Sequence, residues 1–367
     1  MASHQIISAL TRTLAHRRRL PQAESVHINA AIDWLLQSSD VVDRAGFAAG
    51  YYIRSGWGQP YIETTGYIIP TLLNCAATQP HRRDELTEVS RQAGEWLLTQ
   101  QNPDGSFNGY QIAAPVVFDT GQVIFGLVAL YHHTHDTRYL GAINRAADWL
   151  VSVQDVSGAW TQHTYNNQPH AYHARVAWAL LVAYQVTDCQ SHQIAAVRNL
   201  DWVVSGFSHN GWHPQFGFLS GAAASLHTIG YTLRGLVESG RLLNRSDYLQ
   251  RARQLSDQLA QLTGASVLSG EYDGNWQMTS SSQCLTGLAQ VAISWQRLGH
   301  HAPAVQSAIN YIKSCQDLRP QRADTYGALS GSWPIWGRYL PWTYPNWSVK
   351  FFIDTLLLQH SEPRYAG

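Results

Sequence analysis

The feature that most constrains this chain is a helical segment that recurs along its whole length. In its clearest copy, Phe118-Asp119-Thr120-Gly121-Gln122 opens an apolar stretch that ends at Leu127. Aligned on their leucines, five copies are 55, 53, 56 and 52 residues apart and end at Leu72, Leu127, Leu180, Leu236 and Leu288. A looser sixth copy ends at Leu356, 68 residues later. Spacing this even predicts a repeat fold that runs from end to end.

A second helical pattern lies between these segments. It sets one aromatic residue in an apolar stripe at helical spacing. The aromatic is Trp34, Trp96, Trp149 or Trp202 in four copies, is absent around Leu255, and is Tyr311 in the last copy. Several of these segments lead into a turn that contains Gly and ends in an aromatic residue, at 103–107, 157–160, 210–212 and 273–276. Glycine supplies the backbone freedom that such turns need.

Six helix-loop-helix units bury their apolar faces best by closing into a ring. We therefore predict an all-α fold, an (α/α)6 toroid with parallel inner helices and antiparallel outer helices. Residues 26–367 would form this single domain, and residues 1–25 an N-terminal segment. Residues 328–347 depart from the repeat, because three prolines and six aromatic residues make them a long loop. Long loops inside compact domains are often functional.

Composition excludes several kinds of partner and cofactor. Lys+Arg and Asp+Glu are both 25, which gives no general field for nucleic acid or an anionic membrane. The first residues lack a secretory pattern and no apolar run is long enough for a transmembrane segment, so we expect a cytoplasmic protein. The four cysteines are scattered without a CxxC pair, and we expect neither a metal nor another cofactor. The oligomeric state is left open.

Parallel inner helices begin at the same end of a ring, so residues near their N-termini converge on one mouth. The position of Gln122 is polar in all five aligned copies, where it is occupied by Tyr67, Gln122, Arg175, Tyr231 and Gln283. Lys350 reaches the same layer if the sixth copy slips by one residue. This column predicts a polar lumen, and six helix N-termini favour an anionic ligand. The alternative is a buried hydrogen-bond network that only holds the ring together.

Two sets of residues near the mouth suggest chemistry. Glu63 and Asp119 could serve as acid and base in glycoside cleavage. His173, His227 and Tyr231 could instead abstract a proton from a uronic acid, beside an Arg or Lys that neutralises its carboxylate, as elimination or epimerisation requires. These five residues are the predicted catalytic set.

The aromatic content favours a sugar as the ligand. The chain has 14 Trp and 18 Tyr, whose flat rings with polar edges suit the apolar faces of pyranoses. Aromatic residues could equally anchor the loops. The predicted substrate-binding residues are Tyr67, Gln122, Tyr172, Arg175, Trp212, Asp273, Trp276, Gln283, Trp342, Tyr344, Asn346, Trp347 and Lys350.

These motifs resemble known families. Trp96 to Gln101 followed by Asp104-Gly105-Ser106-Phe107 resembles the repeats of squalene-cyclase and prenyltransferase-like α/α toroids. The sixfold count and residues 119–122 are similar to six-hairpin carbohydrate enzymes, which include uronyl hydrolases, polysaccharide lyases and sugar epimerases. Residues 63–70 and 344–347, with Lys350 and Asp354, most resemble uncharacterised proteins of bacterial exopolysaccharide gene clusters. That resemblance implies the toroid but no settled reaction.

Departures from these families guide the functional prediction. The acidic DxDD-type motif of protonation-dependent cyclases is missing, and this sequence has no room for the second toroid that such cyclases usually carry. The zinc ligands of protein prenyltransferases cannot be matched either. We therefore predict an enzyme that processes an exopolysaccharide or its oligosaccharides, acidic and uronate-containing, by lyase, epimerase or hydrolase chemistry. A terpenoid cyclase, favoured by an apolar cavity below Gln122, and a non-catalytic glycan-binding protein are the alternatives.

Overall fold

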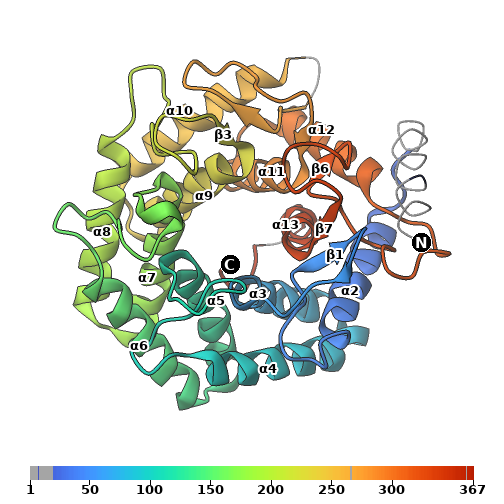
Figure 1. The fold of residues 1–367 in the computed structure, drawn as a ribbon, viewed down its shortest axis with the longest axis horizontal. Coiled ribbons are helices and arrows are strands. Elements are labelled where there is room, and N and C mark those ends of the chain that lie inside the picture. Colours follow the sequence, from blue (N-terminus) through green and yellow to red (C-terminus); the bar gives the residue numbers. More distant parts are fainter. Residues whose placement is uncertain (1–6, 8–19, 265–266, 361) are drawn as a thin grey trace.

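The predicted toroid is confirmed by a computed structural model, which describes residue 7 and residues 20–264, 267–360 and 362–367. Twelve α-helices in these ranges alternate between an outer and an inner ring (Figure 1). The outer helices are α2 (Glu24–Asp40), α4 (Arg83–Gln100), α6 (Thr137–Ser152), α8 (Gln190–Ser205), α10 (Ser246–Thr263) and α12 (Ala302–Cys315). The inner helices are α3 (Ile62–Thr78), α5 (Val117–Thr134), α7 (Ala174–Thr187), α9 (Leu226–Leu242), α11 (Leu285–Leu298) and α13 (Asn346–Leu357). Most of the predicted segment 1–25 lies outside the described residues.

The two rings differ in how their helices are buried. Outer helix α4 buries residues 86, 89, 90, 93, 94 and 97, the stripe of an amphipathic helix. Inner helix α5 is buried almost continuously from Val117 to Leu130. Side chains in the lumen cover one of its faces, and the outer helices cover the other. Inner helices also approach closely through glycine. A Cβ atom on Gly66 would lie 2.6 Å from the Gln122 carbonyl oxygen, so the small-residue face permits the contact between α3 and α5.

Threonines at the starts of inner helices fix the preceding loops. The backbone N–H of Phe107 donates to Thr120 Oγ1 at 3.0 Å, and that of Phe47 donates to Thr65 Oγ1 at 3.1 Å. Each threonine precedes a glycine, and Thr286-Gly287 occupies the same place in α11. The structure thereby corrects the expected register of the fifth copy, because Leu288 rather than Gln283 follows that glycine.

Gln283 lies before the inner helix, not on it. It belongs to the short strand β5 (Gln283–Cys284), and its side-chain oxygen accepts a hydrogen bond from Tyr311 on outer helix α12 at 2.9 Å. Alignment on leucines failed here because the position six residues after the glycine, which is leucine in α3, α5 and α9, is Ile293 in α11, so the leucine at 288 marks a different position.

Within the described residues seven short strands lie in the loops, in keeping with the few strand signals in the sequence. β1 (Gly50–Tyr52) pairs with β2 (Gly56–Trp57) and with β7 (Thr343–Pro345), all antiparallel. β3 (Ala224–Ser225) pairs with β4 (Glu271–Tyr272), and β5 pairs with β6 (Ser332–Trp333). The β1–β7 pair joins the first and last hairpins. Residues 328–347 are mostly irregular as predicted, but Trp347 is already on the first turn of α13.

The end of the ring opposite the mouth is covered by residues 362–367, which lie inside the ring in Figure 1. The Tyr365 backbone N–H donates to Asn74 Oδ1 at 2.9 Å, and Asn74 Nδ2 donates to the Tyr365 carbonyl at 3.0 Å. In the part of the chain that the structure describes, no helix combines the length and apolar character needed to span a bilayer.

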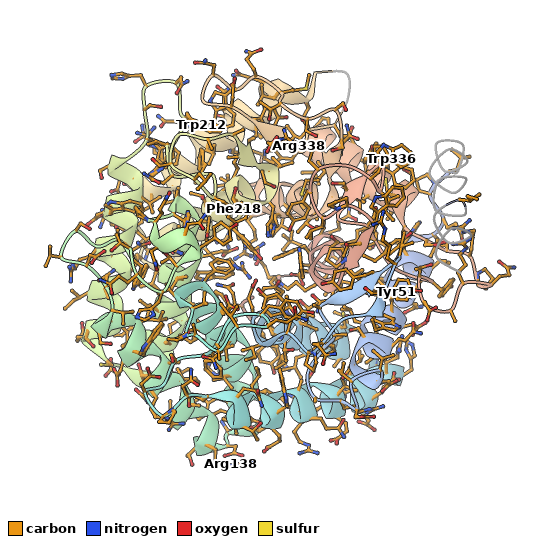
Figure 2. The ribbon with its side chains drawn as sticks, viewed as in Figure 1. Tyr51, Arg138, Trp212, Phe218, Trp336 and Arg338 are labelled. Atoms are coloured by element: carbon orange, nitrogen blue, oxygen red, sulfur yellow. The ribbon has the colours of Figure 1, made fainter. Side chains whose placement is uncertain are left out.

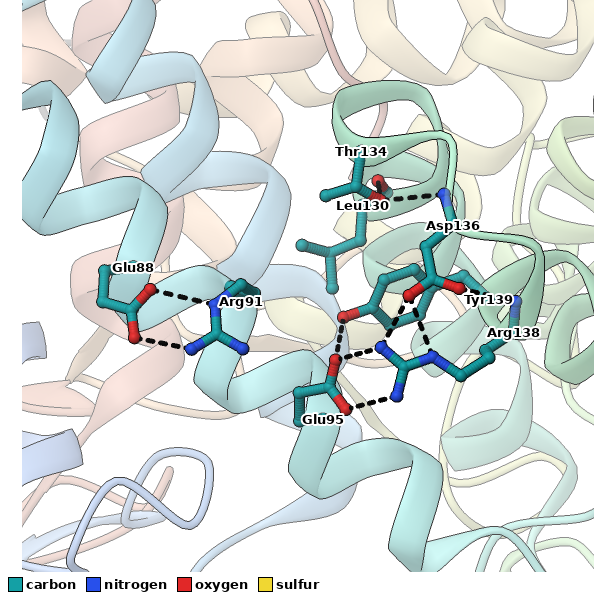
Figure 3. Close-up of polar contacts among 8 residues, drawn as sticks. All are labelled: Glu88, Arg91, Glu95, Leu130, Thr134, Asp136, Arg138 and Tyr139. Atoms are coloured by element: carbon teal, nitrogen blue, oxygen red, sulfur yellow. Dashed lines mark hydrogen bonds and ion pairs between the residues drawn. The ribbon is translucent and has the colours of Figure 1, made fainter.

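Ion pairs link neighbouring outer helices at their exposed edges. Figure 3 shows Glu95 of α4 and Arg138 of α6, whose closest side-chain atoms are 2.7 Å apart. Asp136 binds the same guanidinium at 2.6 Å. Exposed pairs of this kind contribute little stability individually, but they recur around the rim.

Candidate active site

A cavity of about 690 Å³ opens where the inner helices begin. Its walls come from the first turns of α3, α5, α9 and α13, from the residues just before α7, and from the aromatic loop 338–340. This volume falls in the roughly 300–1,000 Å³ range of small-molecule sites. The five predicted catalytic residues all line it, namely Glu63, Asp119, His173, His227 and Tyr231. The structure thus brings them together, and their catalytic roles stay predictions.

Two buried carboxyl groups share one tyrosine. The Tyr61 hydroxyl donates a hydrogen bond to Glu63 Oε2 and lies within hydrogen-bonding reach of Asp119. Asp119 Oδ1 has no hydrogen-bond partner among the described residues. Neither carboxyl group has an ion-pair partner within that same set.

Burial sets the protonation of this pair. It raises the pKa of Glu63 to about 7, although hydrogen bonds from Tyr61 and Tyr67 and the charge of Arg175 act in the opposite direction. Burial raises the pKa of Asp119 well above its usual value, and the negative charge of Glu63 raises it further. The charge of an ionised Glu63 disfavours loss of the proton from Asp119, which favours one carboxylate and one acid in the pair.

The two histidines are neutral. His173 is 1% exposed, and neither ring nitrogen has a hydrogen-bond partner within the described ranges. Burial lowers the pKa of His173 well below its usual value. Burial also lowers the pKa of His227 to about 3, and its Nδ1 lies 3.1 Å from Gln290 Oε1. Neutral imidazoles can exchange hydrogen bonds with a substrate, but they supply no positive charge to a carboxylate.

Arg175 fills the axis of the ring beneath the cavity. It is fully buried, and its Nε donates to Gln122 Oε1 at 2.6 Å. Its guanidinium carbon lies 5.0 to 5.8 Å from ring centroids contributed by five inner helices, those of Tyr67, Phe125, Trp178, Tyr231 and Phe351. Cation–π attraction in such a dry setting stabilises the charge. Arg175 and Gln122 form a floor under the cavity, separated from it by Tyr67 and Tyr231.

Lys350 also lies in the floor, in the layer that the slipped register predicted. Its Nζ is 2.7 Å from Asp354 Oδ2 and 4.3 Å from the ring centroid of Phe351. Burial lowers the pKa of Lys350 to about 7, against the opposing charge of Asp354. The lumen below Gln122 therefore holds buried basic side chains among aromatic rings, and the cavity of about 220 Å³ farther down is lined by Arg234 and Glu238 as well as by Phe125 and Trp178.

Several predicted binding residues lie away from the cavity. Trp212 and Trp276 pack against each other over the outer ring of helices, with their ring centroids 5.1 Å apart. Trp212 is labelled in Figure 2. Asp273 accepts backbone hydrogen bonds from Asn275 and Gln277, both at 2.9 Å, and shapes a turn. Gln283 is bound to Tyr311, as described above. These residues hold loops in place.

A second group supports the mouth from behind. Tyr344 is buried in β7, where it is paired with Tyr51 of β1. Trp342 packs against Trp336, with ring centroids 6.2 Å apart. Asn346 Nδ2 donates to the Ala48 carbonyl at 2.8 Å and to Thr64 Oγ1 at 2.9 Å. Of the remaining predicted binding residues, Tyr67, Tyr172 and Trp347 do line the cavity.

The sequence did not single out several residues of the wall, namely Tyr61, Phe118, Phe218, Arg338 and Tyr339. Phe118 directly precedes Asp119, so one extra position in that alignment would have found it, whereas Tyr61 stands three residues before the aligned Thr64. Tyr339 and Arg338 lie within the long aromatic loop. The Arg338 guanidinium pairs with Glu271 at 2.6 Å, a contact between distant hairpins that leaves no trace in the sequence.

Residues 59–233, slightly less than half of the chain, match the family model of the squalene-hopene cyclase C-terminal domain. This match confirms the predicted resemblance to squalene-cyclase-like α/α toroids over the first hairpins. It covers Glu63, Asp119 and Tyr231.

Solved structures extend the likeness to nearly the whole chain. An unsaturated glucuronyl hydrolase from Bacillus sp. GL1, responsible for glycosaminoglycan degradation, aligns with a TM-score of 0.74 and 12% identity over 93% of this chain and 98% of that one. A heparin-specific unsaturated glucuronyl hydrolase aligns with a TM-score of 0.70 and 13% identity over 90% and 95%. A variant of the unsaturated glucuronyl hydrolase from Streptococcus agalactiae, complexed with dGlcA-GalNAc6S, aligns with a TM-score of 0.68 and 14% identity over 96% of this chain and 95% of that one. At these identities the likeness establishes the shared six-hairpin fold.

Proposed function

We propose that the protein is a glycoside hydrolase that acts on uronate-containing oligosaccharides in the mouth cavity. The observation that carries this proposal is the buried pair of Glu63 and Asp119 around Tyr61. Glycoside hydrolysis commonly uses two carboxyl groups, one as acid and one as base or nucleophile, and burial raises the pKa of both groups here.

In the proposed reaction Asp119 gives its proton to the glycosidic oxygen as the C–O bond breaks. The Glu63 carboxylate faces the positive charge that develops on the sugar ring and accepts a proton from the water that adds there. Tyr61 orients Glu63 through its hydrogen bond. Aromatic side chains, among them Tyr172, Tyr339 and Trp347, would stack on the sugars.

Charge favours a uronate over a neutral sugar. Arg338 lines the cavity at its rim, and Arg175 lies directly beneath Tyr67 and Tyr231. Both guanidinium groups would stabilise a bound carboxylate. The structural neighbours act on unsaturated glucuronyl substrates, as their names state, so an unsaturated glucuronyl oligosaccharide is the first substrate to test.

The test is incubation with unsaturated glucuronyl disaccharides, saturated uronate oligosaccharides and neutral oligosaccharides. Hydrolysis would release new reducing ends without a gain in the ultraviolet absorbance of unsaturated uronates. A gain in that absorbance would identify a lyase, and an altered NMR spectrum without cleavage an epimerase. Glycan binding without any product would favour the non-catalytic alternative. Any of these last three results, or no interaction at all, would contradict the proposal.

A terpenoid cyclase is the second candidate. It is favoured by the aromatic residues that dominate the cavity wall and by the family match. The floor opposes it, because the fixed charge of Arg175 would repel a carbocation formed above it. Mass spectrometry of products after incubation with squalene or a polyprenyl diphosphate would reveal cyclised isomers if this candidate held.

A further inference from the structure

All six junctions between neighbouring outer helices pair a carboxylate with a basic side chain. In chain order the pairs are Asp33–Arg82, Glu95–Arg138, Asp148–His192, Asp201–Arg245, Asp257–His301 and Lys313–Glu24. Figure 3 shows the second of them. Two junctions use histidine in place of a permanently charged cation. Unlike a guanidinium or ammonium group, a neutral imidazole can bind a metal ion.

A thiol joins the histidine at the junction between α6 and α8. Cys189 is the residue before α8, three positions ahead of His192, and residues at this spacing lie on the same face of a first helical turn. Asp148 reaches the same point from α6. One ligand atom from each of the three residues lies within 4.8 Å of the other two.

Thr187 holds two of these residues. Its Oγ1 lies 3.1 Å from His192 Nδ1 and accepts a hydrogen bond from the Cys189 backbone N–H at 3.3 Å. The fully buried His192 ring therefore presents Nε2 to Asp148 Oδ1, at 2.9 Å. The Cys189 sulfur also lies 3.2 Å from Ser191 Oγ. A hydrogen bond to the far nitrogen of an imidazole is the usual way in which proteins orient a metal-binding histidine.

We propose that Asp148, Cys189 and His192 bind a zinc-like divalent cation. This cation would link the outer helices α6 and α8 on the side away from the lumen. A thiolate, an imidazole and a carboxylate are the ligand types that Zn²⁺ prefers, with water as the fourth ligand. Asp148 is 66% exposed, which leaves that fourth position open to solvent. Binding would release the thiol proton to solvent. Asp148 stands 41 residues before Cys189, so the spacing of cysteines alone could not indicate this site.

The test is a titration of the reduced, metal-free protein with Co²⁺ under anaerobic conditions. Cys75, Cys284 and Cys315 are buried, so a thiolate-to-cobalt charge-transfer band would report on Cys189. We expect the band to saturate at one Co²⁺ per chain and to disappear when Zn²⁺ displaces cobalt. Cys189→Ser should abolish it. Thr187→Val should weaken binding by about tenfold through the lost orientation.

Asp201→Asn provides the matched control. It removes the carboxylate from the α8–α10 junction, where the partner is Arg245, and should leave the titration unchanged. Circular dichroism would verify that each variant is folded. Absence of the band, or a band that survives Cys189→Ser, would overturn the proposal. So would Zn²⁺ binding that persists in Cys189→Ser and is lost in His300→Asn, because it would assign the metal to the cluster of Asp257, His300 and His301.

Discussion

Two buried carboxyl groups at opposite ends of the lumen have opposite pKa shifts, because their partners differ. Asp119, at the mouth, has an oxygen without a partner in the described structure, and burial raises its pKa. Glu238, near the other end of α9, accepts two hydrogen bonds from Arg297 at 2.8 Å and pairs with Arg234 at 2.8 Å. Burial would raise the pKa of Glu238 as well, but these two cations hold it below its usual value.

The difference separates a group that stabilises the ring from one that costs stability. A buried carboxylate with two guanidinium partners is fully compensated, and removing it leaves uncompensated charge. An unpaired buried acid is unfavourable in the folded state and is typical of active sites. The charge of Arg175 acts on the neighbouring Glu63, but the Arg175 Nε donates to Gln122 and not to either carboxyl group. The mouth thus holds a carboxyl group whose pKa is raised.

The largest effect is expected at Asp119. Asp119→Asn should lower the turnover of uronate oligosaccharides by about 10²- to 10⁴-fold, because the amide cannot donate the proton in general acid catalysis. Stability should be unchanged or higher, since the substitution removes a buried ionisable group that has no ion-pair partner in the described structure. Steady-state kinetics and urea unfolding on the same preparation would measure both. A parallel loss of activity and stability would break the comparison, since Asp119 would then be structural.

Glu238→Gln should have the reverse outcome. It leaves Arg234 and Arg297 without their carboxylate, and we expect a loss of about 3–5 kcal/mol in the free energy of unfolding. Turnover per folded molecule should stay at the wild-type value. The control is Glu88→Gln, which removes an exposed ion pair with Arg91 on the outer ring (Figure 3) and should change stability little. Equal losses in the two variants would show that Glu238 is no more important than a surface pair.

The pH dependence of stability should distinguish the two ends by sign. The folded state keeps a proton on Glu63 up to a pKa of about 7, whereas the unfolded chain releases it near 4.5. The unfolding free energy should therefore fall as pH rises between these values. Glu238, with its lowered pKa, contributes the opposite slope at lower pH. Urea melts from about pH 5 to about pH 8 should show a flatter curve for Glu63→Gln than for the wild type. If Glu63→Gln had the same pH dependence of unfolding free energy as the wild type, a group other than Glu63 would be responsible for it.

The smallest effect is expected in the aromatic residues. Trp347→Leu removes a ring from the cavity wall and should raise KM about twofold to tenfold, the equivalent of one lost stacking contact. Trp212→Leu should leave KM unchanged and lower the unfolding temperature, because Trp212 packs against Trp276 away from the cavity. A higher KM in the second variant would mean that substrate reaches the outer loops.

Sequence periodicity predicted which residues meet but not how deep they lie. Parallel helices with a common start bring Glu63, Asp119 and His227 to one mouth, and this follows from repeat spacing alone. The depth of Arg175 does not, because packing of five aromatic rings decides that its side chain forms a floor rather than a wall. Contacts between different hairpins, such as Arg338 with Glu271, are equally invisible in a local pattern.

The pairing of β1 with β7 has a consequence for how the protein unfolds. An open stack of hairpins has outermost members, each with one uncovered face, and can fray one unit at a time. Here the first and last hairpins cover each other, so every hairpin has two neighbours. Detaching any one of them must break two interfaces together, which makes the circle cooperative as a whole.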